Sequence, residues 1–167
     1  MRFTPIALAA AIALATMASA GQGQKADDQI DARSTALAGQ GQALLGQARY
    51  SEAMDYYETA LVVDPRNRPA FIGLARAAQG MKLPGKAVKL YNEALKLDPN
   101  DLTALEGQGE ALVQRGAVEK AKANLERLRK LCGDGCAQVS QLSAAIAKGP
   151  PADVVTAQAP TPAPKRP

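Results

Sequence analysis

The chain has 167 residues, of which 47% are hydrophobic, 22% charged and 4% aromatic, and its formal net charge is +4. It contains no histidine, which excludes Ser–His and Cys–His nucleophile pairs, histidine-ligated metal ions and an imidazole general base. The small net charge does not indicate nucleic-acid binding, and an apolar fraction dominated by alanine and leucine favours packed helices over β-structure.

The first 20 residues have the pattern of a secretory signal peptide. Arg2 provides a short positive region, residues 6–17 form an apolar run, and Ala18-Ser19-Ala20 matches the small-residue pattern before a cleavage site. The apolar run is shorter than the roughly 20 residues that a membrane-spanning helix needs. We therefore expect residues 1–20 to be removed. The mature chain is then exported to the periplasm of a Gram-negative bacterium, or otherwise secreted, without stable membrane insertion. An uncleaved anchor is the alternative.

A repeat with a period of 34 residues follows a short lead-in at residues 21–33. The segment LVVDPRNRPAF at 61–71 recurs as LKLDPNDLTAL at 95–105. A period of this length, with small residues at fixed places, indicates stacked helix pairs. The pattern predicts helices at 28–46, 51–63, 68–80, 85–97, 102–115 and 117–131. The residues that recur at this step are Tyr57 and Tyr91, Ala60 and Ala94, Asp64 and Asp98, Pro65 and Pro99, Ala53, Ala87 and Ala121, Gly39, Gly73 and Gly107, and Gly41, Ala75 and Gly109.

The recurring residues also predict how the helices pack. Small side chains such as Gly41 and Ala53 allow two helix axes to approach within about 8–10 Å. The recurring Tyr57 and Tyr91 are expected to fill the gap toward the next unit. The aspartates of each repeat are expected to lie close to the start of the following helix pair, where a helix dipole favours negative charge.

On these residues the chain resembles the tetratricopeptide repeat (TPR) family, whose unit is an antiparallel pair of helices, A and B. The third unit is degenerate, because Leu128 and Gly133 replace the second alanine and the proline of the family pattern, and Gln40 and Gln108 stand where the family prefers leucine. The matching residues are Leu37, Gly41, Ala53, Tyr57, Ala60 and Pro65 in unit 34–67, Phe71, Leu74, Ala75, Ala87, Tyr91, Ala94 and Pro99 in unit 68–101, and Leu105, Gly109, Ala121 and Leu125 in unit 102–135. The resemblance implies an all-α fold, a right-handed α-solenoid of about three helix-turn-helix units.

Two cysteines close the repeat region in the segment Cys132-Gly133-Asp134-Gly135-Cys136. Export places the thiols in an oxidising compartment, and the glycines permit a tight turn, so we predict a disulfide between them. A zinc site is the first alternative, but it needs four ligands. A redox-active pair is the second, but such pairs normally have two intervening residues.

A capping helix and a proline-rich tail complete the chain. The segment 136–148 is expected to hold a helix at 137–147, whose apolar stripe of Val139, Leu142 and Ile146 covers the last repeat. Residues 149–167 contain six of the eleven prolines and are expected to form a disordered or polyproline II spacer. An inert tail and a tether to a partner or the cell wall remain open for this segment.

The TPR resemblance also implies where a partner binds. In that family the A helices line a concave groove, and five positions of each point into it. The positions equivalent to the known clamp for a C-terminal carboxylate hold Ala38, Gln42, Thr103 and Gly107, so this clamp is absent. The predicted groove residues are Ala38, Gln42, Leu45, Ile72, Arg76, Gln79, Glu106, Glu110 and Val113, with Thr35, Gly46, Pro69, Gly80, Thr103 and Gln114 beside them. Small residues such as Gly39, Gly73 and Gly107 are expected to leave room there for a peptide backbone.

Binding is therefore the predicted function. We expect an exported TPR scaffold or adaptor that holds a protein or peptide partner within a cell-envelope assembly such as pilus or secretion machinery. The alternative is a structural protein that self-assembles by end-to-end stacking, consistent with a first unit of net charge −2 and a second of +3. No constellation of acid and base residues predicts an enzyme, and no cofactor or metal ion is expected.

Overall fold

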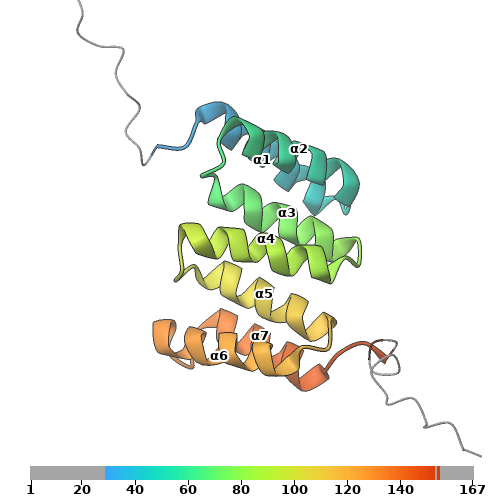
Figure 1. Cartoon of the computed structure of the whole chain (residues 1–167), viewed down its shortest axis with the longest axis vertical. Helices are drawn as coiled ribbons and strands as arrows, with labels where there is room; N and C mark the ends of the chain where they lie inside the picture. The colour runs from blue at the N-terminus through green and yellow to red at the C-terminus, as the bar shows by residue number, and fades with distance from the viewer. Residues whose placement is uncertain (1–28, 153, 155–167) are drawn as a thin grey trace, which may run out of the picture.

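The computed structural model of the protein describes residues 29–152 and 154, and this part of the chain is folded into helices without strands (Figure 1). The predicted all-α fold is confirmed. The predicted signal peptide lies outside the described residues, as do most of the lead-in and most of the proline-rich tail. The helices are α1 Ala32–Gly46, α2 Tyr50–Val63, α3 Arg68–Gly80, α4 Pro84–Leu97, α5 Leu102–Gln114, α6 Val118–Cys132 and α7 Ala137–Lys148.

Side-chain caps determine where the A helices begin. The helix predicted at 28–46 begins only at Ala32, because the carboxylate of Asp31 accepts the N–H of Arg33 at 2.8 Å and ends the preceding extended chain. Asn67 caps α3 by accepting the N–H of Ala70, and Asp101 does the same for α5. The other helix ends lie within one residue of their predicted positions.

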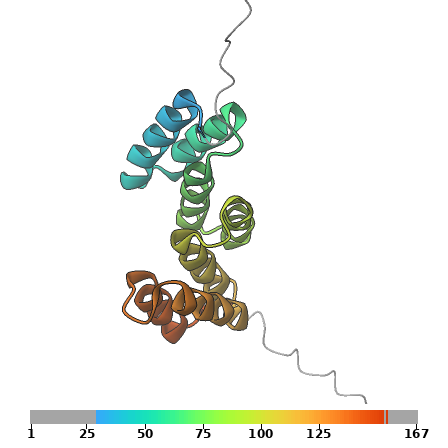
Figure 2. The same ribbon diagram turned by 90° about the vertical axis from the view of Figure 1, so that its left-hand side faces the viewer.

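The helices stack as three antiparallel pairs, α1–α2, α3–α4 and α5–α6, and α7 packs on α5 and α6 (Figure 1). The A helices α1, α3 and α5 also contact one another in succession along the inner side of the stack. Seen from the side, the stack is curved, with α1 and the α6–α7 end reaching toward the same side (Figure 2). These contacts make the chain an α-solenoid with a concave face along α1, α3 and α5.

Tyrosine rings from the B helices fill the gaps between units, as predicted. A Cβ atom on Gly73 would lie 2.2 Å from Cζ of Tyr57, and one on Gly107 would lie 2.4 Å from Cζ of Tyr91. Both tyrosine side chains are almost completely buried. The expectation that Gly73 and Gly107 leave room for a partner backbone was wrong, because each glycine is already covered by a ring of the preceding unit.

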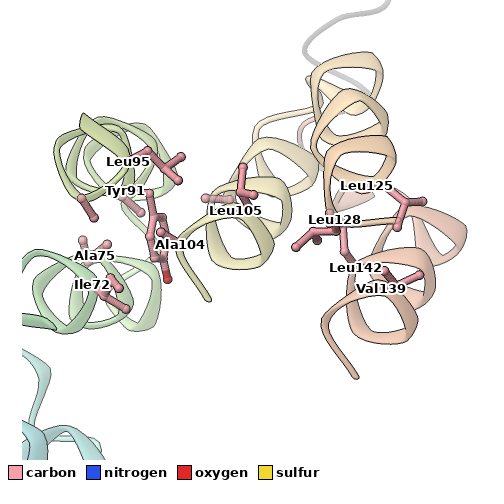
Figure 3. Packing of buried hydrophobic residues seen from close by; sticks show 14 residues of the cluster. Ile72, Ala75, Tyr91, Leu95, Ala104, Leu105, Leu125, Leu128, Val139 and Leu142 are labelled. Carbon is pink, nitrogen blue, oxygen red and sulfur yellow. The ribbon is translucent and has the colours of Figure 1, made fainter. Parts of the chain in front are cut away.

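The capping helix α7 packs on the degenerate third unit through side chains that do not follow the TPR pattern. Leu142 of α7 rests on Gly109, where a Cβ atom would lie 2.6 Å from a methyl carbon of the leucine. Leu142 and Val139 are buried beside Leu125 and Leu128 of α6 (Figure 3). The predicted cap is confirmed, and Leu128 occupies the site of the missing alanine without a defect because α7 completes the core around it.

A buried hydrogen bond between Asn124 and Gln108 explains why Gln108 stands where the TPR family prefers leucine. The amide of Asn124 donates to the carbonyl oxygen of Leu105 at 3.0 Å and to Oε1 of Gln108 at 2.9 Å. Gln108 thus replaces the usual leucine because it has a buried hydrogen-bonding partner on the opposite helix, as buried polar groups require.

The recurring aspartates contact the start of their own unit's A helix. Asp64 accepts the N–H groups of Asp31 at 2.9 Å and Arg66 at 3.0 Å, and it pairs with the Arg66 guanidinium at 3.1 Å. These contacts, the Arg66 side chain first, hold the pKa of Asp64 well below its usual range. The equivalent Asp98 pairs with Arg68 at the start of α3. The sequence prediction had placed both residues only beside the following unit.

The cysteine pair lies between α6 and α7. The two Sγ atoms are 2.14 Å apart, at bonding distance, and the Cα atoms are 5.8 Å apart. Gly133 ends α6 with a φ of 79°, a conformation that glycine adopts without strain. The geometry therefore permits the predicted link between the two C-terminal helices.

The chain after α7 is not wholly extended where it is described. Residues 152 and 154 are helical, and the N–H of Val154 donates to the carbonyl oxygen of Pro151 at 3.0 Å. Pro150 and Pro151 precede these residues, so their missing N–H groups remove no helical hydrogen bond. Among the described residues, no helix is both long enough and apolar enough to cross a membrane.

A candidate partner-binding groove

Two hollows lie along the concave face and define the candidate site, which we call the concave groove. The N-terminal hollow, between α1 and α3, has a volume of about 300 Å³, and the C-terminal hollow, beside the ends of α3 and α5, has about 820 Å³. The N-terminal hollow is lined by Ile30, Thr35, Ala38, Gly39, Gln42, Tyr57, Asn67 and Pro69. The C-terminal hollow is lined by Gln79, Lys82, Pro84, Glu110, Val113, Gln114, Ala145, Lys148, residues 149–152 and Val154.

The structure brings most of the predicted groove residues to this face. Ala38 and Gln42 line the N-terminal hollow, and Gln79, Glu110 and Val113 line the C-terminal one. The C-terminal hollow therefore combines predicted residues of α3 and α5, and the N-terminal hollow combines those of α1 with Pro69 of α3.

Arg76 of α3 lies near Glu106 of α5, since the positive charge of Arg76 opposes the rise in the pKa of Glu106. The Arg76 side chain is exposed, whereas Glu106 and Glu110 are half-buried. This pair of helices therefore carries both signs of charge toward the C-terminal half of the groove.

The apolar side chains predicted for the groove are packed into or against the hydrophobic core, unlike the polar ones. Ile72 is only 8% exposed and belongs to the hydrophobic core, and Leu45 packs against the core of the first unit. Val113 is also buried, at 4% exposure, although one side of it faces the C-terminal hollow. Ile72 is thus a structural residue, since position 5 of α3 points between units rather than into the groove.

The two recurring tyrosines each contact a glutamine at the groove. The Tyr91 hydroxyl donates to Oε1 of Gln79 at 2.7 Å, and the Tyr57 hydroxyl donates to Oε1 of Gln42 at 3.3 Å. Burial raises the pKa of Tyr91, and the nearby Glu106 charge adds to this effect. The tyrosines therefore act as neutral donors that orient the glutamine side chains.

The carboxyl group of Glu106 has a strongly shifted pKa. Its burial, followed by repulsion from Glu110, raises the pKa of Glu106 to about 7, while the Arg76 charge acts in the opposite direction. The carboxyl group therefore changes charge near neutral pH. The groove offers amide, carboxyl and guanidinium groups, which can hydrogen bond and form ion pairs with a polypeptide.

Two features of the site escaped the sequence analysis. The residues after α7 line the C-terminal hollow, as do Lys82 and Pro84 from the turn between α3 and α4. No periodic signal marks either segment, because both lie outside the regular A-helix positions.

A further hollow of about 560 Å³ lies on the outer side between α4, α5 and α6, and includes Arg115 and Lys120. The described residues contain no cluster of three or more His, Cys, Asp or Glu that could hold a metal ion.

The repeat region is similar to known proteins. A family model described as tetratricopeptide repeat matches residues 44–101. No curated protein sequence matches the chain.

Solved structures are similar over more of the chain. The first TPR domain of Spaghetti (RPAP3), bound to the HSP90 peptide SRMEEVD, is 25% identical, with 69% of this chain and 94% of that chain covered and a TM-score of 0.62. The TPR domain of Sgt2 from Aspergillus fumigatus is 23% identical over 86% of this chain and 95% of that chain, with a TM-score of 0.66. The Yersinia enterocolitica type III secretion chaperone SycD, in complex with a peptide of the translocator YopD, is 19% identical over 68% and 86%, with a TM-score of 0.60.

Proposed function

We propose, from the tetratricopeptide repeat match over residues 44–101 and the TPR fold of the similar structures, that the chain is a TPR adaptor that binds a protein or peptide partner in the concave groove. The observation that carries the proposal is the pair of hollows that α1, α3 and α5 form along one face. Two of the similar structures, the RPAP3 domain and SycD, are complexes with peptides, which supports this mode of binding.

The residues of the groove favour a particular kind of segment. The N-terminal hollow is small and bordered by Ala38 and Gly39, so it accepts small or narrow side chains. The C-terminal hollow is larger and has charged residues of both signs, so it accepts a polar segment. A free C-terminal carboxylate is not the proposed anchor, because Ala38, Gln42 and Thr103 offer no cation at the family's clamp positions.

Export to the cell envelope is part of the proposal. Its support is the signal-peptide pattern of residues 1–20, which precedes the repeat region. The adaptor would then serve an envelope assembly such as pilus or secretion machinery. Sequencing the N-terminus of protein recovered from the periplasm tests this, since Gly21 is the expected first residue and Met1 would contradict export with cleavage.

Two groove substitutions test the binding site. Ala38→Arg fills the N-terminal hollow, and Arg76→Glu reverses an exposed charge between the hollows, whereas Lys89→Glu reverses a charge on the outer side of α4. We expect partner recovery in pull-downs to fall at least tenfold for each groove variant and to stay unchanged for Lys89→Glu. Equal recovery for all three variants would contradict the groove. Ile72→Arg is unsuitable, because Ile72 is buried in the core and its replacement destabilises the fold.

Self-assembly by end-to-end stacking is the other candidate function. Its support is the exposed apolar surface of α2, where Val62 is 84% exposed and Tyr56 is 38% exposed. The opposite end of the stack is covered by α7, whose Leu142 already occupies the surface of Gly109. Adaptor function is therefore preferred. Light scattering across protein concentration distinguishes the two, since stacking predicts oligomers that grow without a partner.

A further inference from the structure

The chain that follows α7 forms one wall of the C-terminal hollow. Pro150 and Val154 are half-buried, although both lie beyond the last complete helix. They share the hollow with Gln79, Glu110 and Val113 of the concave groove. The last described residue, Val154, therefore lies at the groove itself rather than on a distant surface.

We propose that residues 155–167 bind the C-terminal half of the concave groove of the same chain as an intramolecular ligand, with Lys165 and Arg166 beside Glu106 and Glu110. The inference rests on the proposed peptide-binding role of the groove and names a first occupant for it. An external partner then binds by displacing this segment.

The length of the segment allows the contact. Lys165 follows Val154 by 11 residues, which span about 34 Å as polyproline II at about 3.1 Å per residue. Glu106 lies one helical turn, about 6 Å, beyond Glu110, which already lines the hollow with Val154. Because the reach exceeds the distance, the segment has an effective concentration of the order of millimolar at the groove, and weak contacts suffice.

The sequence of the segment suits an extended ligand. It contains four prolines, which restrict the backbone before binding and so reduce the conformational entropy lost on binding. Residues 155–164 carry no charged side chain, and the two charges of the segment are adjacent at Lys165 and Arg166.

The charges of the hollow match this arrangement. Lys82 and Lys148 line the hollow together with Glu110, and an uncharged segment beside the two lysines meets no repulsion. Of the two acids of α5, Glu110 lines the hollow and Glu106 lies one helical turn farther along α5, where the two cations of the segment are proposed to bind. Arg76 lies near Glu106, and its exposed guanidinium is expected to turn toward solvent when the segment is bound.

Paramagnetic relaxation in the full-length chain tests the contact. A nitroxide on Ala163→Cys, attached under non-reducing conditions, is expected to attenuate the amide signals of Gln79, Glu110 and Val113 to less than half of their diamagnetic intensity. Lys165→Glu with Arg166→Glu in the labelled chain is expected to restore these signals. The matched control, Lys89→Glu with Lys130→Glu, makes the same charge change on exposed positions of α4 and α6 and is expected to leave the attenuation in place.

Two results would overturn the proposal: no selective attenuation at the groove, or attenuation that persists in the Lys165→Glu, Arg166→Glu chain. The experiments distinguish a tail that does not bind the groove from a groove that does not bind a partner. If attenuation is absent while Ala38→Arg and Arg76→Glu still abolish partner recovery, the groove binds partners but not its own tail. If the tail binds and the groove variants leave partner recovery unchanged, the adaptor role fails instead.

Discussion

The two halves of the concave groove are built around equivalent tyrosines but differ in chemistry. Tyr57 and Tyr91 are 34 residues apart, and each covers a glycine of the next unit. Yet Tyr57 holds Gln42 through a hydrogen bond of 3.3 Å, whereas Tyr91 holds Gln79 through one of 2.7 Å. The repeated residues thus fix the framework, and the residues that do not repeat give each half its own polar surface.

The ninth residue of each unit shows this most directly. Gln42, Arg76 and Glu110 occupy this position in the first, second and third units, so the groove changes from neutral to positive to negative along its length. A uniform scaffold therefore presents a directional pattern of charge. A partner segment with the complementary order would bind in one orientation only, which is how charge pattern provides specificity.

Adding a methyl group beneath either tyrosine is expected to have the largest effect on stability. Gly73→Ala and Gly107→Ala place a Cβ atom 2.2 Å and 2.4 Å from a tyrosine Cζ atom, and such overpacking costs about 2–3 kcal/mol of the free energy of unfolding. Gly39→Ala is the control, because no atom lies within 4 Å and a helical alanine gains about 0.5–1 kcal/mol. Urea denaturation measures all three, and equal stabilities would show that the rings can move aside.

Reduction of the predicted disulfide should affect one end of the groove and not the other. The loop between Cys132 and Cys136 is short, so its closure contributes about 2 kcal/mol. Mass spectrometry of unreduced protein should find no free thiol. Hydrogen exchange after reduction should increase in α6 and α7 but not in α1 and α2. Free thiols in protein purified in air would contradict the pairing.

Removing one hydroxyl at a time compares the two halves directly. Tyr91→Phe leaves Oε1 of Gln79 without its donor and should cost about 1 kcal/mol, whereas Tyr57→Phe loses a longer hydrogen bond and should cost about 0.5 kcal/mol. Thermal unfolding of the two variants checks the order. A larger loss for Tyr57→Phe would mean that the second half of the groove is not the more tightly organised one.

The last expected difference is a pH dependence of stability that belongs only to the C-terminal half. Because the pKa of Glu106 is raised from 4.5 to about 7, the folded chain holds a proton that the unfolded chain releases between these pH values. This contribution favours the folded state at low pH and is lost as pH rises through 7.

Glu106→Gln should therefore stabilise the protein at pH 8 relative to the wild type, and more so than at pH 5. The difference should be about 1 kcal/mol, since solvent screens a half-buried group. Asp55→Asn on the exposed side of α2 serves as the control. Denaturation at the two pH values measures the effect, and an identical effect of Glu106→Gln at both would disprove the assigned pKa.

Most of the fold could be predicted from the sequence, because the 34-residue period is carried by residues whose packing role is local. The exception at the N-terminus of α1 arose from Asp31, a capping residue that hydrophobic periodicity does not register. The rings over Gly73 and Gly107 were only half predicted. The sequence indicated that Tyr57 and Tyr91 fill a gap, but not that the same glycines form its far wall.

The site was less predictable than the fold. Family positions located Gln42, Gln79 and Glu110 at the hollows, but Ile72 was assigned to the groove although its side chain is buried in the core. The contribution of Val154 to the C-terminal hollow could not be read from its sequence, because it depends on the direction in which the chain leaves α7. Such non-local contacts carry no periodic signal.

The central claim is that the concave groove holds a partner, and site-specific photo-crosslinking in living cells tests it most directly. A benzophenone amino acid at Gln42 or Gln79 lies in a hollow, and the same residue at Lys89 or Lys122 lies on an exposed B-helix position. We predict crosslinks to one and the same protein from both groove positions and none to that protein from the other two. Crosslinks to a shared protein only from Lys89 and Lys122 would contradict the account.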